Sequence, residues 1–264
     1  LINASTGIYG GFINLGAQDI PKIPKFLRRA LYGALMAYAD TYKQLLLPDS
    51  IEFYNNLTYD LAELQKLECS QLLHFLTKVF LYCNFTDDEI LNKMFMKIID
   101  TITYFQDVDS IDSEILSHIF MSLIYIFRIN KNKFAASVNH ILLYIQFLIQ
   151  NYQVDNVEFK LAYMSLYLNL VMLFELPLND EVKQLFNEIK LMKNLEVLPF
   201  IADCFLYAFR VVGDEFLPLL AKLASVLFSS EHYILSVMDE ETLAFYFNLM
   251  NSIPQDDLIG YTNL

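Results

Sequence analysis

The chain has 264 residues, of which 55% are hydrophobic and 19% are charged, and its 31 acidic and 18 basic residues give a net charge of −13. A chain this apolar is able to bury a large core, which excludes intrinsic disorder. The acidic excess disfavours binding of nucleic acid through a broad basic face. No run of 18 or more uninterrupted apolar residues occurs, so we predict no membrane-spanning helix.

Glycine is distributed unevenly along the chain. Four of the seven glycines lie within the first 16 residues, and none occurs between Gly33 and Gly213. A β-rich or α/β protein of this size needs glycine in many turns, whereas helices joined by Asn, Asp, Ser and Pro corners do not. We therefore predict an all-α fold with an irregular lead-in over residues 1–24, a helical-repeat domain over residues 25–252 and a tail over residues 253–264.

Helical spacing of apolar residues, together with start and stop signals, predicts a series of helices. Pro48 stops the first of them, and Thr86 and Glu89 are expected to form a capping box at the start of another. Gly213 has the position of a glycine that ends a helix. The expected helices cover residues 25–46, 50–68, 70–83, 90–105, 113–129, 134–152, 155–176, 181–192, 195–212, 214–229 and 239–251.

These helices pair into hairpins whose first members begin at nearly equal intervals. The expected starts near positions 70, 113, 155, 195 and 239 are separated by 43, 42, 40 and 44 residues. The corners repeat as well, because FLYC at 80–83 followed by DE at 88–89 matches FLYA at 205–208 followed by DE at 214–215. Such a period is typical of stacked helical hairpins. We predict an α-solenoid of antiparallel hairpins with a period of about 40–44 residues, and the alternative is an irregular helix bundle.

The period and the hairpin layout resemble the armadillo and HEAT class of α-solenoids over roughly residues 25–250. The order of apolar helix, corner and Asp-Glu pair also resembles the heptatricopeptide-type repeats of FASTK- and RAP-domain organellar proteins. The first resemblance implies a stack of helical hairpins. The second implies RNA handling in a mitochondrion or plastid.

Motifs for catalysis and cofactor binding are missing from the sequence, which contains no P-loop, dinucleotide-binding glycine motif, nucleophile elbow or zinc-protease motif. The segment Asp107–Asp112 lacks the glycine and the final glutamate of a calcium loop and is expected to cap the next helix. We predict no catalytic residue, cofactor or metal site. The four histidines are expected to lie in separate hairpins, at His74, His118, His140 and His232.

The three cysteines, Cys69, Cys83 and Cys204, lie within or beside apolar helical runs and form no CxxC pair. An odd number of such residues without a framework is typical of free, buried thiols. We therefore expect an intracellular, reducing compartment. The cytoplasm or nucleus is preferred, and the mitochondrion is the alternative.

We expect a non-enzymatic helical-repeat scaffold that forms one section of a larger protein or complex and binds a protein partner with a basic or helical surface. Second helices of the hairpins are expected to line the binding surface. The alternatives are an RNA-associated organellar repeat protein and an all-α ligand-binding or enzymatic domain. The candidate partner-binding residues are the acidic corners and the one dense basic cluster, namely Asp87, Asp88, Glu89, Asp214, Glu215, Lys25, Arg28 and Arg29.

Overall fold

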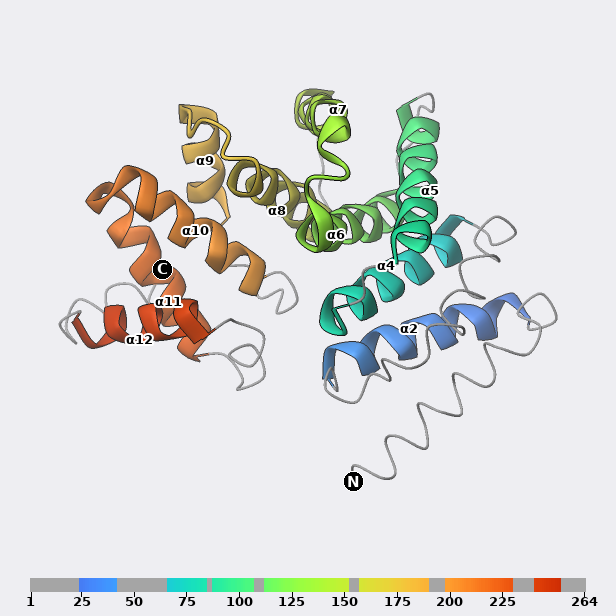
Figure 1. The fold of residues 1–264 in the computed structure, drawn as a ribbon, viewed down its shortest axis with the longest axis horizontal. Coiled ribbons are helices and arrows are strands. Elements are labelled where there is room, and N and C mark those ends of the chain that lie inside the picture. Colours follow the sequence, from blue (N-terminus) through green and yellow to red (C-terminus); the bar gives the residue numbers. More distant parts are fainter. Residues whose placement is uncertain are drawn as a thin grey trace, which may run out of the picture. The chain divides into compact units, whose positions relative to one another are not determined.

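The protein is all-α throughout the part of the chain that the structure, a computed structural model, describes (Figure 1). That part contains ten α-helices and two short 3₁₀ helices and no β-strand, which confirms the prediction that the fold is all-α. None of its helices combines the length and the apolar character needed to cross a lipid bilayer. The described residues are 24–41, 66–84, 87–106, 112–151, 157–189, 198–229 and 240–252.

The chain divides into two compact units, unit 1 (Leu1–Phe159) and unit 2 (Lys160–Leu264). The helical-repeat domain predicted over residues 25–252 therefore contributes to both units. The predicted tail, and the predicted lead-in apart from Pro24, lie outside the described residues.

Unit 1 is built around α4, which packs against α2 and α6, while α5 packs against α6 (Figure 1). Every residue of α4 from Glu68 to Phe80 is buried. Because an α-helix turns once every 3.6 residues, burial of so many consecutive residues means that α4 is enclosed on all sides. The helices of this unit are α2 (Lys25–Thr41), α4 (Lys66–Tyr82), α5 (Asp88–Gln106), α6 (Ser113–Asn130), the 3₁₀ helix η4 (Ala135–Ser137) and α7 (Val138–Asn151).

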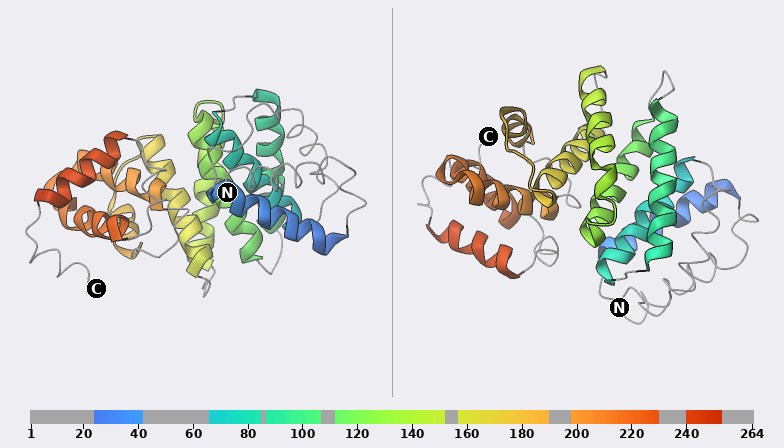
Figure 2. Two further views of the ribbon diagram at one scale, coloured as in Figure 1. Left: turned by 90° about the horizontal axis from the view of Figure 1, so that it is seen from below. Right: turned by 45° about the horizontal axis from the view of Figure 1, so that its top comes forward.

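Unit 2 has a smaller core in which α11 contacts both α10 and α12, the orange to red helices of Figures 1 and 2. Phe186 of α9 lies edge-on to Phe205 and Phe216, with ring centroids 4.8 and 5.2 Å away. Such edge-to-face pairs add to the free energy gained by burying the rings. The helices are α8 (Val157–Leu173), whose first turn belongs to unit 1, α9 (Asp180–Glu188), α10 (Leu198–Val212), the 3₁₀ helix η5 (Asp214–Phe216), α11 (Leu217–Ser229) and α12 (Glu240–Ser252).

Local signals fix several helix ends where the sequence predicts them. The Asp112 carboxylate accepts hydrogen bonds from two backbone N–H groups of the first turn of α6, each at 3.1 Å, as the predicted cap. Asn179 caps α9 by accepting the N–H of Val182 at 2.9 Å. Gly213 ends α10 with φ = +84°, a conformation that costs glycine little because it has no Cβ.

The capping box predicted at the start of α5 lies partly outside the described residues. Thr86 lies outside the described residues, and the cap within them is Asp87, whose Oδ1 accepts the N–H of Glu89 and of Ile90, each at 3.0 Å. The Glu89 carboxylate instead forms an ion pair with Lys93, 2.8 Å away. The helix consequently begins at Asp88, two residues before the predicted start.

One predicted helix boundary is wrong, because α4 runs without a break through the predicted gap between Glu68 and Ser70. The Ser70 hydroxyl donates to the carbonyl of Leu67 at 2.8 Å, so the serine bonds within the helix instead of starting one. Apart from residues 66–68, which belong to α4, the helix predicted over residues 50–68 lies outside the described part of the chain. A second difference is that α7 begins at Val138, after the short turn η4.

Candidate functional site

A groove of about 340 Å³ lies within unit 2. Its walls come from the end of α8, from one face of α10 and from the first turn of α12. The α10 residues of the groove follow one another at steps of three, one and three positions, and this spacing places them on one face of a helix. We call this site the acidic groove; it is lined by Met172, Asp203, Leu206, Tyr207, Arg210, Glu241 and Thr242.

A buried hydrogen bond joins α12 to α10, the two helices that supply most of the residues lining the acidic groove. The hydroxyl of Tyr246, a residue with no exposed surface, donates to the backbone carbonyl of Ala202 at 2.8 Å. Burial raises the pKa of Tyr246 well above its usual range, and the charges of Asp203 and Cys204 raise it further.

Replacing Tyr246 with phenylalanine is expected to lower the free energy of unfolding of unit 2 by about 1–2 kcal/mol, because the Ala202 carbonyl loses its donor in a buried setting. The folded state raises the pKa of this tyrosine, so its contribution to stability is present below about pH 10 and is lost above it. The Tyr246→Phe variant should therefore lose less stability than the original chain as the pH rises above about 10. Hydrogen exchange of α10 and α12 measures the effect, with the amides of unit 1 as the internal control; unchanged exchange in both helices contradicts it.

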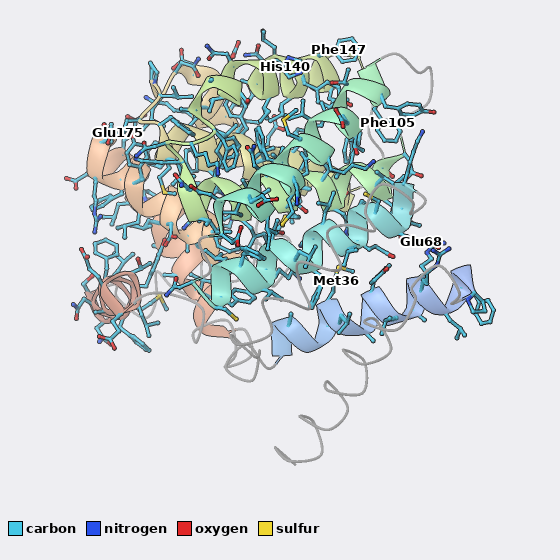
Figure 3. The ribbon with its side chains drawn as sticks, turned by 45° about the vertical axis from the view of Figure 1, so that its right-hand side comes forward. Met36, Glu68, Phe105, His140, Phe147 and Glu175 are labelled. Carbon is cyan, nitrogen blue, oxygen red and sulfur yellow. The ribbon has the colours of Figure 1, made fainter. Side chains whose placement is uncertain are left out.

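The rim of the acidic groove carries one ion pair. Arg210 Nη2 donates to Glu241 Oε1 at 2.9 Å, and the two side chains are 57% and 82% exposed. A pair this exposed contributes little to stability and is able to exchange partners in water. Burial, followed by the charge of Glu175, raises the pKa of Tyr207. Glu175, labelled in Figure 3, follows α8 with φ = +51°.

The described residues that line the acidic groove combine an apolar wall with carboxylates and include no histidine or cysteine. Among the residues that the structure describes, no three His, Cys, Asp or Glu side chains converge as they do in a metal site. The groove therefore has the chemistry to bind a group that is cationic at one end and apolar along its length.

The predicted acidic corner at the start of α5 is occupied by contacts within unit 1. Asp87 caps the helix, and Glu89 pairs with Lys93. Asp88 lies 3.0 Å from Lys133 Nζ, which also donates to the Asp88 carbonyl at 2.8 Å. These contacts join α5 to the turn that follows α6, so the corner has an evident structural role.

The second predicted acidic corner, Asp214 and Glu215, forms η5 and is exposed. The Glu215 carboxylate lies 3.6 Å from Lys183 Nζ of α9. Neither residue lines the acidic groove. The corner therefore lies on the surface of the same unit but apart from the cavity.

The predicted basic cluster does not form one continuous surface. Arg28 is only 9% exposed and forms an ion pair with Glu68, with 3.5 Å between Nη2 and Oε2; Figure 3 labels Glu68 near the start of α4. Arg29 donates to both carboxylate oxygens of Glu114 at 3.2 Å. The side chain of Lys25 lies outside the described residues.

A partly buried polar seam between α4 and α6 was not expected from the sequence. His74 Nδ1 lies 3.0 Å from His118 Nδ1, so one ring donates and the other accepts, and the Tyr82 and Tyr125 hydroxyls are 3.4 Å apart. The two histidines are predicted to lie in separate hairpins, and in the structure their rings are within hydrogen-bonding distance of each other. Their separation of 44 residues is one period of the predicted repeat, and that spacing is the signal that identifies the pair.

The three cysteines are free, and they differ in their surroundings. Cys69 and Cys204 are buried, whereas Cys83 is partly exposed. Burial raises the pKa of Cys69 to about 11, although the nearby charge of Lys97 opposes that rise. Burial also raises the pKa of Cys83.

Alkylation at pH 8 is expected to modify Cys83 first, because the thiolate is the reactive form and a buried thiol is neither ionised nor accessible. Cys69 and Cys204 should react only after the chain unfolds. A timed pulse of iodoacetamide followed by peptide mass spectrometry measures the order, with the protein in denaturant as the control. Rapid modification of Cys69 in the folded protein contradicts the burial of α4.

No protein-family model matches the chain, and neither the curated proteins nor the solved structures contain a match. The candidate site consequently rests on the geometry of this chain, in particular on the acidic groove of unit 2.

Proposed function

We propose that the chain is a helical-repeat scaffold of the armadillo or HEAT type that binds a protein partner. The observation that supports the repeat is a set of contacts between residues one period apart. In a solenoid, equivalent positions of successive hairpins stack on one another, which produces contacts at the repeat spacing. At separations of 43–45 residues, His74 meets His118, Tyr82 meets Tyr125, Asp88 meets Lys133, and Ala202 meets Tyr246.

A protein partner is favoured over RNA by the state of the basic residues. Seven of the described lysines and arginines form ion pairs with carboxylates of the same unit. A surface that binds the phosphate backbone needs basic side chains that are able to neutralise phosphates. The pairing, together with the net charge of −13, supports a partner that presents a basic surface.

Binding is favoured over catalysis by the composition of the acidic groove. Its apolar wall and charged rim have the character of a protein interface, in which a desolvated centre is surrounded by polar side chains. We place the scaffold in a reducing intracellular compartment, on the basis of its free thiols.

Affinity purification of the full chain from cells of its source tests this proposal, with and without nuclease, against an unrelated helical protein of equal net charge. We expect a defined set of proteins that the control does not capture and that nuclease treatment does not remove. Recovery of RNA, or of proteins that nuclease releases, contradicts a protein scaffold and favours the RNA-handling alternative.

A further inference from the structure

We infer that the acidic groove receives a lysine or arginine side chain from a basic segment of the partner. This inference rests on the proposed function and names the chemistry of the partner at that site.

The charge of the acidic groove favours a cation. Two carboxylates, Asp203 and Glu241, line it, and Arg210 is the one cation among the described residues of its lining. Glu175 lies close enough to Tyr207 to raise the pKa of that phenol. Unit 2 as a whole contains fourteen acidic and six basic residues, so its field also draws a basic segment towards the groove.

The size and lining of the groove fit a single long side chain. Its volume of about 340 Å³ is at the small end of the range of ligand sites, about 300–1,000 Å³. Met172 and Leu206 form an apolar wall along which the methylene stem of a lysine or arginine is able to pack. The charged head would then lie near Asp203, which is half-buried.

The rim supplies a simple way to admit the cation. The Arg210–Glu241 pair is largely exposed, so separating the two side chains costs little free energy. An incoming guanidinium or ammonium replaces Arg210 as the partner of Glu241, and Arg210 moves into solvent. Arg210 therefore opposes a cationic ligand by competing for Glu241.

An anionic ligand is the alternative, and it predicts the opposite effect of Arg210. A carboxylate or phosphate entering the groove would use Arg210 as its counter-ion, so loss of this residue would weaken binding. A cationic side chain gains when Arg210 is removed. The sign of one substitution thus separates the two classes of ligand.

The test measures fluorescence anisotropy of a labelled arginine-rich Gly-Ser peptide and of a glutamate-rich peptide of equal length, titrated with the full chain. We expect only the arginine peptide to bind. Asp203→Asn should weaken its binding by about fivefold and the pair Asp203→Asn/Glu241→Gln by more than tenfold, whereas Arg210→Gln should tighten it by about twofold to fivefold. Repeating the titration at physiological ionic strength should reduce every affinity.

Glu215→Gln is the matched control, because it removes one negative charge from the surface of unit 2 outside the groove. It should change the affinity by less than twofold. Equal losses for Asp203→Asn and Glu215→Gln would mean that the peptide responds to overall charge, which overturns the inference. Weaker binding of the arginine peptide by Arg210→Gln, or binding of the glutamate peptide, overturns it as well.

The same variants separate this inference from the proposed function. If the full chain captures a protein partner and Asp203→Asn/Glu241→Gln captures it equally well, the scaffold stands and the groove is not its cation site. If the chain captures no protein, the proposed function fails whatever the peptides do. Circular dichroism and hydrogen exchange of α10 and α12 confirm that each variant is folded.

Discussion

Replacing Phe120 with alanine is expected to destabilise unit 1 by about 3–5 kcal/mol, since truncation of a buried phenylalanine removes apolar contacts and leaves a cavity. The side chain has no exposed surface. Its ring stacks on Phe159, with centroids 5.8 Å apart, and lies edge-on to Tyr144 at 6.3 Å. Phe120 therefore joins α6 to α7 and to the first turn of α8 within unit 1.

Urea unfolding followed by circular dichroism, with hydrogen exchange of α6 and α7, measures this loss. The matched control is Leu143→Ala on α7, whose side chain is 65% exposed and whose removal should change stability by less than about 0.5 kcal/mol. A loss below about 1 kcal/mol for Phe120→Ala would contradict the packing of this core.

Glu68→Leu is expected to cost about 3–5 kcal/mol, because it leaves the buried Arg28 guanidinium without its counter-ion. The pair is 3.5 Å apart, and the side chains of Arg28 and Glu68 are 10% and 5% exposed. Among the described residues, Arg28 Nε has no hydrogen-bond acceptor, so the pair is incompletely satisfied there. The double variant Arg28→Met/Glu68→Leu should therefore be about as stable as the original chain, or more stable.

A double-mutant cycle measured by urea unfolding tests this expectation. The exposed pair of Arg29 and Glu114 is the control, and Arg29→Ala should cost less than about 1 kcal/mol. If Glu68→Leu costs no more than Arg29→Ala, the burial of the Arg28–Glu68 pair is contradicted. If the double variant is as unstable as Glu68→Leu, the loss comes from packing instead of from an unpaired charge.

Local chemistry made much of the helix pattern predictable. Gly213, Asn179 and Asp112 each end or start a helix through interactions within a few residues, so the sequence contains the whole signal. The boundary predicted at Ser70 is wrong because serine is able either to cap a helix or to bond within one. Burial of α4 between α2 and α6, contacts that are distant in sequence, decides between the two.

The candidate site was less predictable, because charge in a sequence does not indicate its partner. Asp88 is an exposed corner residue by its position, yet its ion-pair partner Lys133 lies 45 residues further along the chain. Arg28 belongs to a basic cluster in the sequence and is buried in the fold. The acidic groove requires α8, α10 and α12 to converge, and no local pattern specifies that convergence.

Photo-cross-linking from the acidic groove tests most directly whether this chain is a partner-binding scaffold. In one variant, a benzophenone amino acid replaces Tyr207, which lines the groove. In the control variant, the same amino acid replaces Phe247 on the exposed face of α12. We expect the first position to cross-link a protein through a segment rich in lysine and arginine, and the second to give no such product. If the chain captures a protein partner but position 207 gives no protein cross-link, the acidic groove is contradicted as the binding site; cross-linking to RNA would contradict the protein scaffold itself.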